Sequence, residues 1–405
     1  MKPQDARWRS ETNRPAAYRV RTYRSFEELP ADYRRLFEDM GGVSFSFSLP
    51  WFRAFASTAL QENAELRLYG VESGEAEIRA HGLLVAQTPA ARRGSVLRNR
   101  HVGRRTLSGL TGYQTYLYAP LLREDDPGYD EILASLARLL RSERPRWELI
   151  DFSAMDADER CYGTLAAALH RVGYAVHRYP HFSSIFESTR KLEYADYLER
   201  LPQSGRRQLR DYERKERQLQ REYSYRVELF RNGKELDQAV SDFASVLEAS
   251  WKEPDQHPEF LPKCIRAAAQ AGALRLMVIY LNDHPTAAQL VFLAGRRAVF
   301  YRTAYDPKYA KRSVGGIVKL RMVRHLLGED RVDELDLGRD REAYKRFFAT
   351  NERLRRGILA FDCRTLGGLR SLAAQLAFEL YDWLGDTSRP ARAKLKALRK
   401  RDKVV

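Results

Sequence analysis

The stretch of sequence with the most pronounced chemical character runs from Tyr301 to Leu327. An extended pattern ends at Asp306, a basic loop that includes Arg312 follows, and Ser313-Val314-Gly315-Gly316 opens an amphipathic helix. Glycine lets a ligand approach the main chain closely, the first amides of a helix have no helical acceptor, and the helix dipole adds partial positive charge at that end. The pattern therefore predicts an anion-binding site. The alternative is a solvated loop with a serine cap and a Gly-Gly turn.

The elements around this stretch repeat an earlier part of the chain. Trp147 to Asp151 and Val332 to Asp336 are short strand patterns, and each follows a helical pattern at a similar distance from a preceding pair of strands. Strands and helices alternate in both halves, which predicts mixed sheets flanked by helices. The expected fold class is therefore α/β, built from two tandem units over residues 18–186 and 187–385.

Composition sets the outer limits of this fold. The chain has 405 residues, of which 44% are hydrophobic, and this is enough for two domains of about 100–200 residues each. No apolar run approaches the roughly 18–20 residues that a membrane-crossing helix needs, so we expect a cytoplasmic protein. The three cysteines, Cys161, Cys264 and Cys363, have no partner at ligand spacing, so neither a disulfide framework nor a metal site is predicted.

The two ends of the chain differ from the rest. Residues 1–17 form a polar, arginine-rich leader for which we expect disorder. Between Leu366 and Leu384 the leucines fall on one helical stripe, which predicts an amphipathic helix that caps the second domain with this stripe. Residues 386–405 form a basic tail. A peripheral contact with an anionic inner membrane surface, a contact with nucleic acid and a solvated terminus are all compatible with it.

A series of short motifs, mostly in the second half, resembles a known family. In chain order they are Ser204-Gly205-Arg206-Arg207-Gln208-Leu209-Arg210, Trp251-Lys252, Leu274-Arg275-Leu276, Ala287-Ala288-Gln289-Leu290-Val291-Phe292, Tyr301 to Asp306, Ser313-Val314-Gly315-Gly316, Glu334-Leu335-Asp336-Leu337-Gly338 and Tyr344-Lys345. Their order is similar to that of the CelD-like acyltransferases of the GNAT superfamily, which are associated with cellulose biosynthesis and related to the Fem-type peptidoglycan aminoacyltransferases. The resemblance extends over most of residues 18–361.

This resemblance implies a tandem GNAT fold whose second half binds an acyl donor, usually acyl-CoA, across a splayed pair of strands. Arg312 and the Ser313-Val314-Gly315-Gly316 turn would hold the donor pyrophosphate, with two adjacent glycines in place of the usual glycine-containing loop. Gln289 would hydrogen-bond to donor or acceptor, or have a purely structural partner. The first half has acids and prolines at the corresponding place, residues 118–127, and would shape the acceptor cleft without binding a donor.

Amide formation in such an enzyme needs three events: the amine loses a proton, the oxyanion is stabilised and the leaving thiolate is protonated. Asp306 and Glu334 are the candidates for accepting the amine proton. Tyr305 or Tyr301 would protonate the thiolate. Structural alternatives exist, since Asp306 would also cap the turn that follows it and Tyr301 would also pack against the sheet.

The resemblance also implies acceptor-binding residues. Tyr344-Lys345 occupies the position of a pair that faces an acceptor phosphate in Fem-type relatives. Arg207 and Arg210 open a charged helix where similar arginines serve comparable substrates, and Trp251 belongs to the same set. The helix over residues 203–222 alternates basic and acidic residues, which is also typical of a solvated, salt-bridged face.

These observations favour an N-acyltransferase of envelope, exopolysaccharide or lipid biosynthesis. Its co-substrate would be acyl-CoA, its acceptor an amine-bearing small molecule or lipid-linked amine, and it would need no metal. A Fem-like transferase that uses aminoacyl-tRNA is the alternative among enzymes, because a net charge of +16 suits tRNA phosphates. A non-catalytic nucleic-acid-binding protein or a scaffold without turnover is the alternative outside them. Without a zinc-finger or RNA-recognition signature, no nucleic acid partner is expected.

Overall fold

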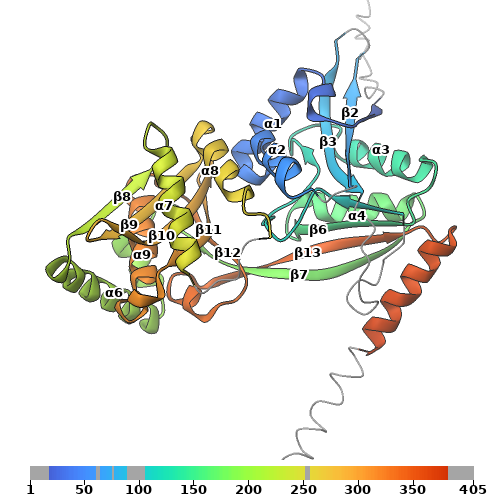
Figure 1. Ribbon diagram of the computed structural model, residues 1–405. Helices are drawn as coiled ribbons and strands as arrows, with labels where there is room; N and C mark the ends of the chain where they lie inside the picture. The colour runs from blue at the N-terminus through green and yellow to red at the C-terminus, as the bar shows by residue number, and fades with distance from the viewer. Residues whose placement is uncertain (1–17, 61–63, 75–76, 89–104, 251–255, 382–405) are drawn as a thin grey trace, which may run out of the picture.

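One mixed sheet runs through both halves of the chain, with helices packed on its faces (Figure 1). The computed structural model describes residues 18–60, 64–74, 77–88, 105–250 and 256–381. The strands are β1 (Arg19–Tyr23), β2 (Glu65–Ser73), β3 (Arg79–Thr88), β4 (Thr106–Gly109), β5 (Leu121–Leu122), β6 (Leu149–Asp156), β7 (Ala175–Ser188), β8 (Tyr225–Phe230), β9 (Leu274–Leu281), β10 (His284–Ala294), β11 (Arg297–Tyr305), β12 (Glu334–Arg339) and β13 (Asn351–Phe361).

The helices follow the predicted alternation. The α-helices are α1 (Asp32–Val43), α2 (Leu49–Thr58), α3 (Tyr129–Ser142), α4 (Arg160–Arg171), α5 (Tyr194–Arg200), α6 (Gln203–Glu222), α7 (Leu236–Ala249), α8 (Phe260–Gln270) and α9 (Val314–Gly328). Short 3-10 helices are η1 (Phe26–Glu28), η2 (Phe45–Phe47), η3 (Pro307–Arg312) and η4 (Ala343–Phe347). A further helix over residues 366–381 follows β13.

The sheet contains the same series of strands twice. Its order is β1-β2-β3-β4-β6-β13-β7-β12-β11-β10-β9-β8, and β5 lies beside β3. Each half contributes one parallel pair, β4 with β6 and β11 with β12, whereas the pairs β2–β3 and β9–β10 that precede them are antiparallel. The predicted α/β fold of two tandem mixed-sheet units with flanking helices is therefore confirmed.

The last strand of each half lies across the junction between the halves. β7 pairs with β13 over Ala175–Phe186 and with β12 over Ser184–Ser188. β13 pairs on its other side with β6, so the final strand of the chain completes the sheet of the first half. The predicted boundary at Phe186 falls inside β7, which connects the two halves.

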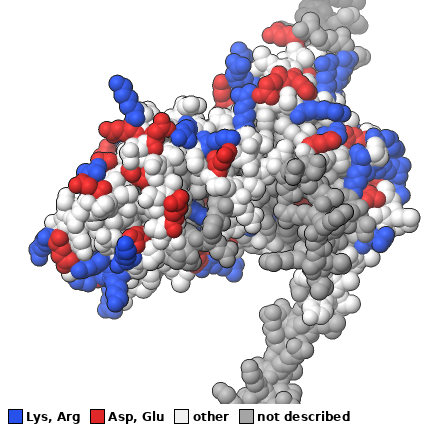
Figure 2. Space-filling model, in the orientation of Figure 1, with Lys and Arg blue, Asp and Glu red and all other residues white. Residues whose placement is uncertain are grey.

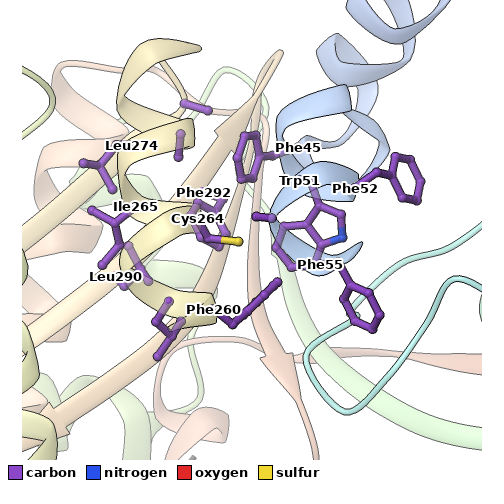
Figure 3. Packing of buried hydrophobic residues seen from close by; sticks show 14 of the residues in the cluster. Phe45, Trp51, Phe52, Phe55, Phe260, Cys264, Ile265, Leu274, Leu290 and Phe292 are labelled. Carbon is purple, nitrogen blue, oxygen red and sulfur yellow. The ribbon is translucent and has the colours of Figure 1, made fainter. Parts of the chain in front are cut away.

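A hydrophobic cluster also joins the halves beside the sheet. The ring centroid of Trp51 in α2 lies 5.3 Å from that of Phe260 in α8 and 6.0 Å from that of Phe292 in β10 (Figure 3). Phe45 reaches the same Phe292 ring at 4.8 Å, and all four side chains are buried. Burying one large apolar side chain contributes about 1.5–3 kcal/mol, so this cluster holds α2 and α8 together.

The helix of residues 366–381 packs against the first half. Leu372 contacts the buried cluster of Leu149, Leu359 and Phe361, which belongs to β6 and β13. The expectation that the leucine stripe caps the second domain is therefore wrong, because β13 crosses to the first half and carries the helix with it. None of the described helices is long and apolar enough to cross a membrane.

Candidate functional site

The parallel strands β11 and β12 separate along their length. They pair only over Arg297–Val299 and Glu334–Asp336. A bulge in the ladder between β10 and β11 leaves Tyr301 as an extra residue just past this point, and such bulges redirect side chains at functional sites. Beyond Val299 and Asp336 no ladder joins the two described strands, and residues of both line one cavity.

Gly338 sets how closely the two strands approach at the opening. Its φ is +74°, and a Cβ at this position would lie 2.7 Å from the carbonyl oxygen of Phe300 in β11. Its amide donates to Asp336 Oδ1 at 2.9 Å, within the turn that ends the buried part of β12. A residue with a side chain would push β12 away from β11 and change the shape of the gap.

The helix α9 begins beyond the end of β11, as the glycine motif predicted. The carbonyl oxygen of Ser313 accepts from the amides of Gly316 and Ile317 at 2.9 and 3.0 Å. Among the described residues, no hydrogen bond engages the amides of Val314 and Gly315. A Cβ on Gly315 would lie 2.7 Å from the ring of Tyr305, so only glycine lets this ring lie against the helix start.

Basic side chains surround the start of α9, and acidic residues of α6 pair with some of them. Lys215 of α6 donates to Ser313 Oγ at 2.8 Å, and Arg312 pairs with Glu222 at 2.6 Å. The serine hydroxyl accepts this bond and does not cap the helix. Asp306 accepts from the amide of Lys308 at 2.9 Å and caps η3, which is the structural alternative foreseen for it.

A cavity of about 120 Å³ lies where the two halves meet. Tyr113 to Tyr116 of the first half line one side, and parts of β11, β12, α9 and η4 line the rest. The hydroxyl of Tyr301 donates to the carbonyl of Gln114 at 2.9 Å, and Arg339 Nη1 donates to the carbonyl of Tyr113 at 3.2 Å. These bonds fix the tyrosine-rich segment against the separating strands.

Lys319 of α9 carries a buried positive charge on the wall of this cavity. Its side chain is nearly inaccessible, and its Nζ lies 5.3 Å from the ring centroid of Phe300 and 5.0 Å from that of Tyr344. An ammonium group over aromatic faces is attracted by their negative π-systems. Lys319 follows Gly315 by four positions, so both lie on the same side of α9, one turn apart.

Tyr344 and Lys345 lie side by side but differ in their surroundings. Tyr344 lines the cavity and is 36% exposed, and its partial burial raises the pKa of its phenol. Lys345 is buried; its Nζ donates to the main-chain carbonyls of Gly338, Arg339 and Asp340 and pairs with Glu342 at 2.7 Å. Lys345 thus ties η4 to the end of β12.

Arginine side chains give the cavity a positive character. Arg302, Arg339 and Lys319 line it, and the acids on its wall, Asp340 and Glu342, are exposed. Burial, and then the charge of nearby Arg339, lower the pKa of His181 to about 4. Its Nδ1 accepts from the amide of Ala154 at 3.0 Å, so this imidazole is neutral and adds no charge beside Arg339, which pairs with Asp340 at 4.0 Å.

Two other predicted site residues have structural partners. Gln289 is fully buried, its amide nitrogen donates to the carbonyls of Leu290 and Arg302, and its oxygen accepts from Thr303 at 2.7 Å. Glu334 pairs with Arg297 at 3.0 Å and with Arg353 at 2.6 Å, at the closed end of the strand pair. Neither side chain lines the cavity.

The predicted arginines of α6 lie on the surface. Arg207 and Arg210 are exposed, while acidic residues of this helix pair with arginines of α9, as in Glu213 with Arg324 and Glu216 with Arg321 at 2.6 Å. Figure 2 shows basic and acidic side chains intermingled over the part of the molecule where α6 lies in Figure 1. The salt-bridged alternative therefore describes much of α6. Trp251 lies outside the described residues.

This chain is similar to known proteins in sequence over one segment and in structure over most of its length. Residues 206–346 match the family of the acetyltransferase (GNAT) domain. This segment lies in the second half, and the first half repeats its order of strands. A conserved protein of unknown function from Bacteroides thetaiotaomicron is similar in structure, with a TM-score of 0.51 and 8% identity over 86% of this chain and 100% of that one. A search of curated proteins finds no similar sequence.

Two further solved structures have lower similarity. FemX matches with a TM-score of 0.47 and 10% identity over 76% of this chain and 94% of its own. A tandem GNAT protein from the clavulanic acid biosynthesis pathway matches with a TM-score of 0.42 and 12% identity over 85% of this chain and 98% of its own. The GNAT domain match supports a transferase that moves acyl groups.

The cavity is lined by residues that sequence reasoning missed. Lys319, Arg339 and the segment from Tyr113 to Tyr116 line the cavity, and none of them was a candidate. For Lys319 a signal existed, because it follows Gly315 by four positions and a helix of this period brings both to one face. The tyrosine-rich segment carried no such signal, since its contact with Tyr301 joins residues far apart in the sequence.

Proposed function

We propose that this protein is an N-acyltransferase of the GNAT type that transfers an acyl group from acyl-CoA to an amine. The observation that carries the proposal is the separation of β11 from β12 with the start of α9 at its open end, within the segment that matches the GNAT domain. The amides of Val314 and Gly315 are suited to bind the donor pyrophosphate, with Arg312 and Lys215 nearby. The acyl chain would then extend between the strands toward the cavity.

The chemistry proposed for the cavity is an attack of a neutral amine on the thioester carbonyl. Orientation of the two reactants and main-chain donors of β11 would supply much of the rate. We propose Tyr301 as the group that protonates the leaving thiolate, because it lies on the cavity wall beside the bulge. Tyr305 and Asp306 flank the start of α9, so their positions suit donor binding better than proton transfer. Glu334 faces two arginines, and water is the better route for the amine proton.

We propose further that the acceptor carries an anionic group. Lys319, Arg302 and Arg339 give the cavity cationic side chains, and Lys319 is almost fully buried. A phosphate-bearing or lipid-linked amine of envelope, exopolysaccharide or lipid biosynthesis, as in the CelD-like type, would suit these charges. Arg207 and Arg210 would serve such an acceptor only from outside the cavity.

Donor binding tests this proposal through thermal unfolding with CoA, acetyl-CoA and long-chain acyl-CoAs. A ligand at a hundredfold excess over its Kd stabilises the native state by about 2.7 kcal/mol, so a clear rise in Tm is expected. Gly315→Asp places bulk and negative charge at the start of α9 and should abolish this rise. Gly315→Ala is the matched control, because it introduces the same contact with Tyr305 without the charge, and it should keep part of the rise.

Two results would contradict the proposal. If CoA raises the Tm of Gly315→Asp as much as that of the unaltered protein, the pyrophosphate does not bind at α9. If no acyl-CoA raises the Tm of the unaltered protein, the donor is of another kind, and aminoacyl-tRNA, with uncharged tRNA as its control, becomes the ligand to test.

The proposed anionic acceptor predicts a large effect at Lys319. A hydrogen bond to a charged group contributes about 1.5–3 kcal/mol, and about 1.4 kcal/mol corresponds to a tenfold change. Lys319→Met keeps much of the apolar packing and should lower kcat/KM about 10- to 100-fold, measured as thiol release from acyl-CoA with a panel of amines. Lys311→Met, on the exposed part of η3, should change kcat/KM less than twofold by the same arithmetic. Equal kcat/KM for Lys319→Met and the unaltered protein would remove this residue from the site.

A further inference from the structure

The helix of residues 366–381 packs with its polar side inward. Ser371 and Gln375 are buried, and Gln375 Nε2 donates to Glu379 at 2.8 Å and lies 3.4 Å from His177 Nε2 of β7. His177 also pairs with Glu379 at 2.9 Å. A Cβ on Gly367 would lie 2.1 Å from the carboxylate of Glu148, so the helix lies close against the end of β6. Polar and small residues thus form this contact together with Leu372, which packs against Leu149, Leu359 and Phe361.

The opposite side of this helix is apolar and exposed to solvent. Leu366, Leu369, Leu376 and Leu380 are 81%, 47%, 54% and 56% exposed, and Tyr381 is 74% exposed. Their spacing of three, seven and four residues places the leucines on one stripe, which extends for about 21 Å at 1.5 Å per residue. Figure 1 shows the helix, in red, projecting from the edge of the first half away from the sheet.

This arrangement reverses the usual orientation of an amphipathic helix. A surface helix normally buries its apolar stripe against the protein and turns its polar side to water. Burying a leucine side chain is favourable, so four exposed leucines on one stripe leave a large gain to be made by a partner. A contiguous apolar patch of this kind marks an interaction surface.

The sequence that follows the helix indicates which partner fits. Residues 382–405 contain eight basic side chains, Arg389, Arg392, Lys394, Lys396, Arg399, Lys400, Arg401 and Lys403, against three aspartates, Asp382, Asp386 and Asp402. Trp383 and Leu384 follow Tyr381 after one residue, Asp382. An apolar stripe followed by an aromatic residue and a run of cations matches the layers of an anionic bilayer, where acyl chains lie beneath interfacial groups and negative headgroups.

We propose that the leucine side of helix 366–381 binds the surface of an anionic lipid bilayer. The helix would lie in the plane of the interface, with Leu366, Leu369, Leu376 and Leu380 inserted among the acyl chains. The basic side chains of the sequence that follows would be attracted to anionic headgroups. A second copy of the chain fits less well, because joining two leucine stripes would bring two such cationic segments together. The proposal does not depend on the transferase assignment.

Vesicle co-sedimentation of the full chain tests the proposal. We expect binding to vesicles of 70% phosphatidylcholine and 30% phosphatidylglycerol, weak binding to pure phosphatidylcholine, and a loss of binding in high salt. Leu369→Glu with Leu376→Glu should lower the partition coefficient at least tenfold without changing the Tm, because both side chains already face water. Val43→Glu is the control, since Val43 is an exposed apolar residue, 52% accessible, in α1 of the same half, and its substitution should leave partitioning unchanged.

Three outcomes would overturn the proposal. One is the absence of vesicle binding by the unaltered chain, and another is equal binding of the double variant and the unaltered chain. The third is a dimer in sedimentation velocity that the double variant converts to a monomer while vesicle binding remains, which would assign the leucine side to self-association.

Discussion

A fragment of residues 18–188 is expected not to reach its native fold when expressed alone. Among the described strands, β7 pairs only with β13 and β12, and the fragment contains neither of them. β6 would also lose β13, and the buried cluster around Phe152 would lose Ile358 and Ala360. A domain is stable by only about 5–15 kcal/mol, and losing the core packing of Ile358, Leu359 and Phe361, at about 1.5–3 kcal/mol each, removes most of that margin. Near-UV circular dichroism and urea unfolding would show a state without cooperative packing.

A single added strand should restore the fragment. Asn351 of β13 lies opposite Phe186 of β7 in an antiparallel ladder, so Ser188 can be joined to Asn351 by a hairpin loop of about 2–5 residues. The resulting chain, residues 18–188 followed by 351–381, regains β13 and the helix that packs on it. We expect a cooperative urea transition for this chain. A cooperative transition for the fragment without β13 would mean that the crossing strands are not needed for either half to fold.

Local patterns in the sequence are sufficient for most elements but not for the crossing of strands. The charged helix was predicted over 203–222 and is α6, and the helix opened by the glycine motif is α9. Periodicity and termini encode such helices within a few residues of sequence. β7 and β13 both carry ordinary strand patterns, and nothing within either strand specifies whether it pairs with its own half or with the other. That choice depends on contacts between residues far apart in the chain.

The candidate site was predictable where it depends on main chain and less where it depends on side chains. Gly315 and Gly316 mark the helix start, because glycine lets other groups approach the main chain closely there. The surroundings of Gln289 and Lys345 depend on tertiary partners: carbonyls of β10 and β11 accept from Gln289, and carbonyls at the end of β12 accept from Lys345. A motif places such a residue near a site, but only the fold decides whether its polar group faces the ligand.

The C-terminal helix shows the same limit for hydrophobic patterns. The leucine stripe was correctly predicted to be helical, because a period of 3.6 residues is a local property. Which side of the helix meets the protein was predicted wrongly. Gln375 meets His177 of β7 and Gly367 lies against Glu148 just before β6, whereas the described leucines of the stripe other than Leu372 were left outside.

Replacing Arg355 by methionine is expected to cost about 3–5 kcal/mol of unfolding free energy. The Arg355 side chain is 2% exposed and pairs with Asp156 of β6 and, at 3.6 Å, with Asp336 of β12. Its removal leaves Asp336 without this cation and Asp156 with only Arg353, at 3.8 Å, and breaking a buried pair in this way costs several kcal/mol because the remaining charge has little water around it. Urea unfolding of the full chain measures the loss.

The controls for Arg355 separate charge from packing. Arg346→Met removes an exposed arginine that pairs with Glu352 at 2.5 Å, and about 1 kcal/mol or less is expected there. Adding Asp156→Asn to Arg355→Met should recover part of the loss, because it removes one of the stranded charges. If it recovers nothing, the cost arises from packing.

Asp336 also holds the amide of Gly338, so a carboxylate freed from Arg355 can move and change the distance between β11 and β12. We therefore expect Arg355→Met to weaken acyl-CoA binding even at urea concentrations at which the variant is still folded. Arg346→Met should leave binding unchanged.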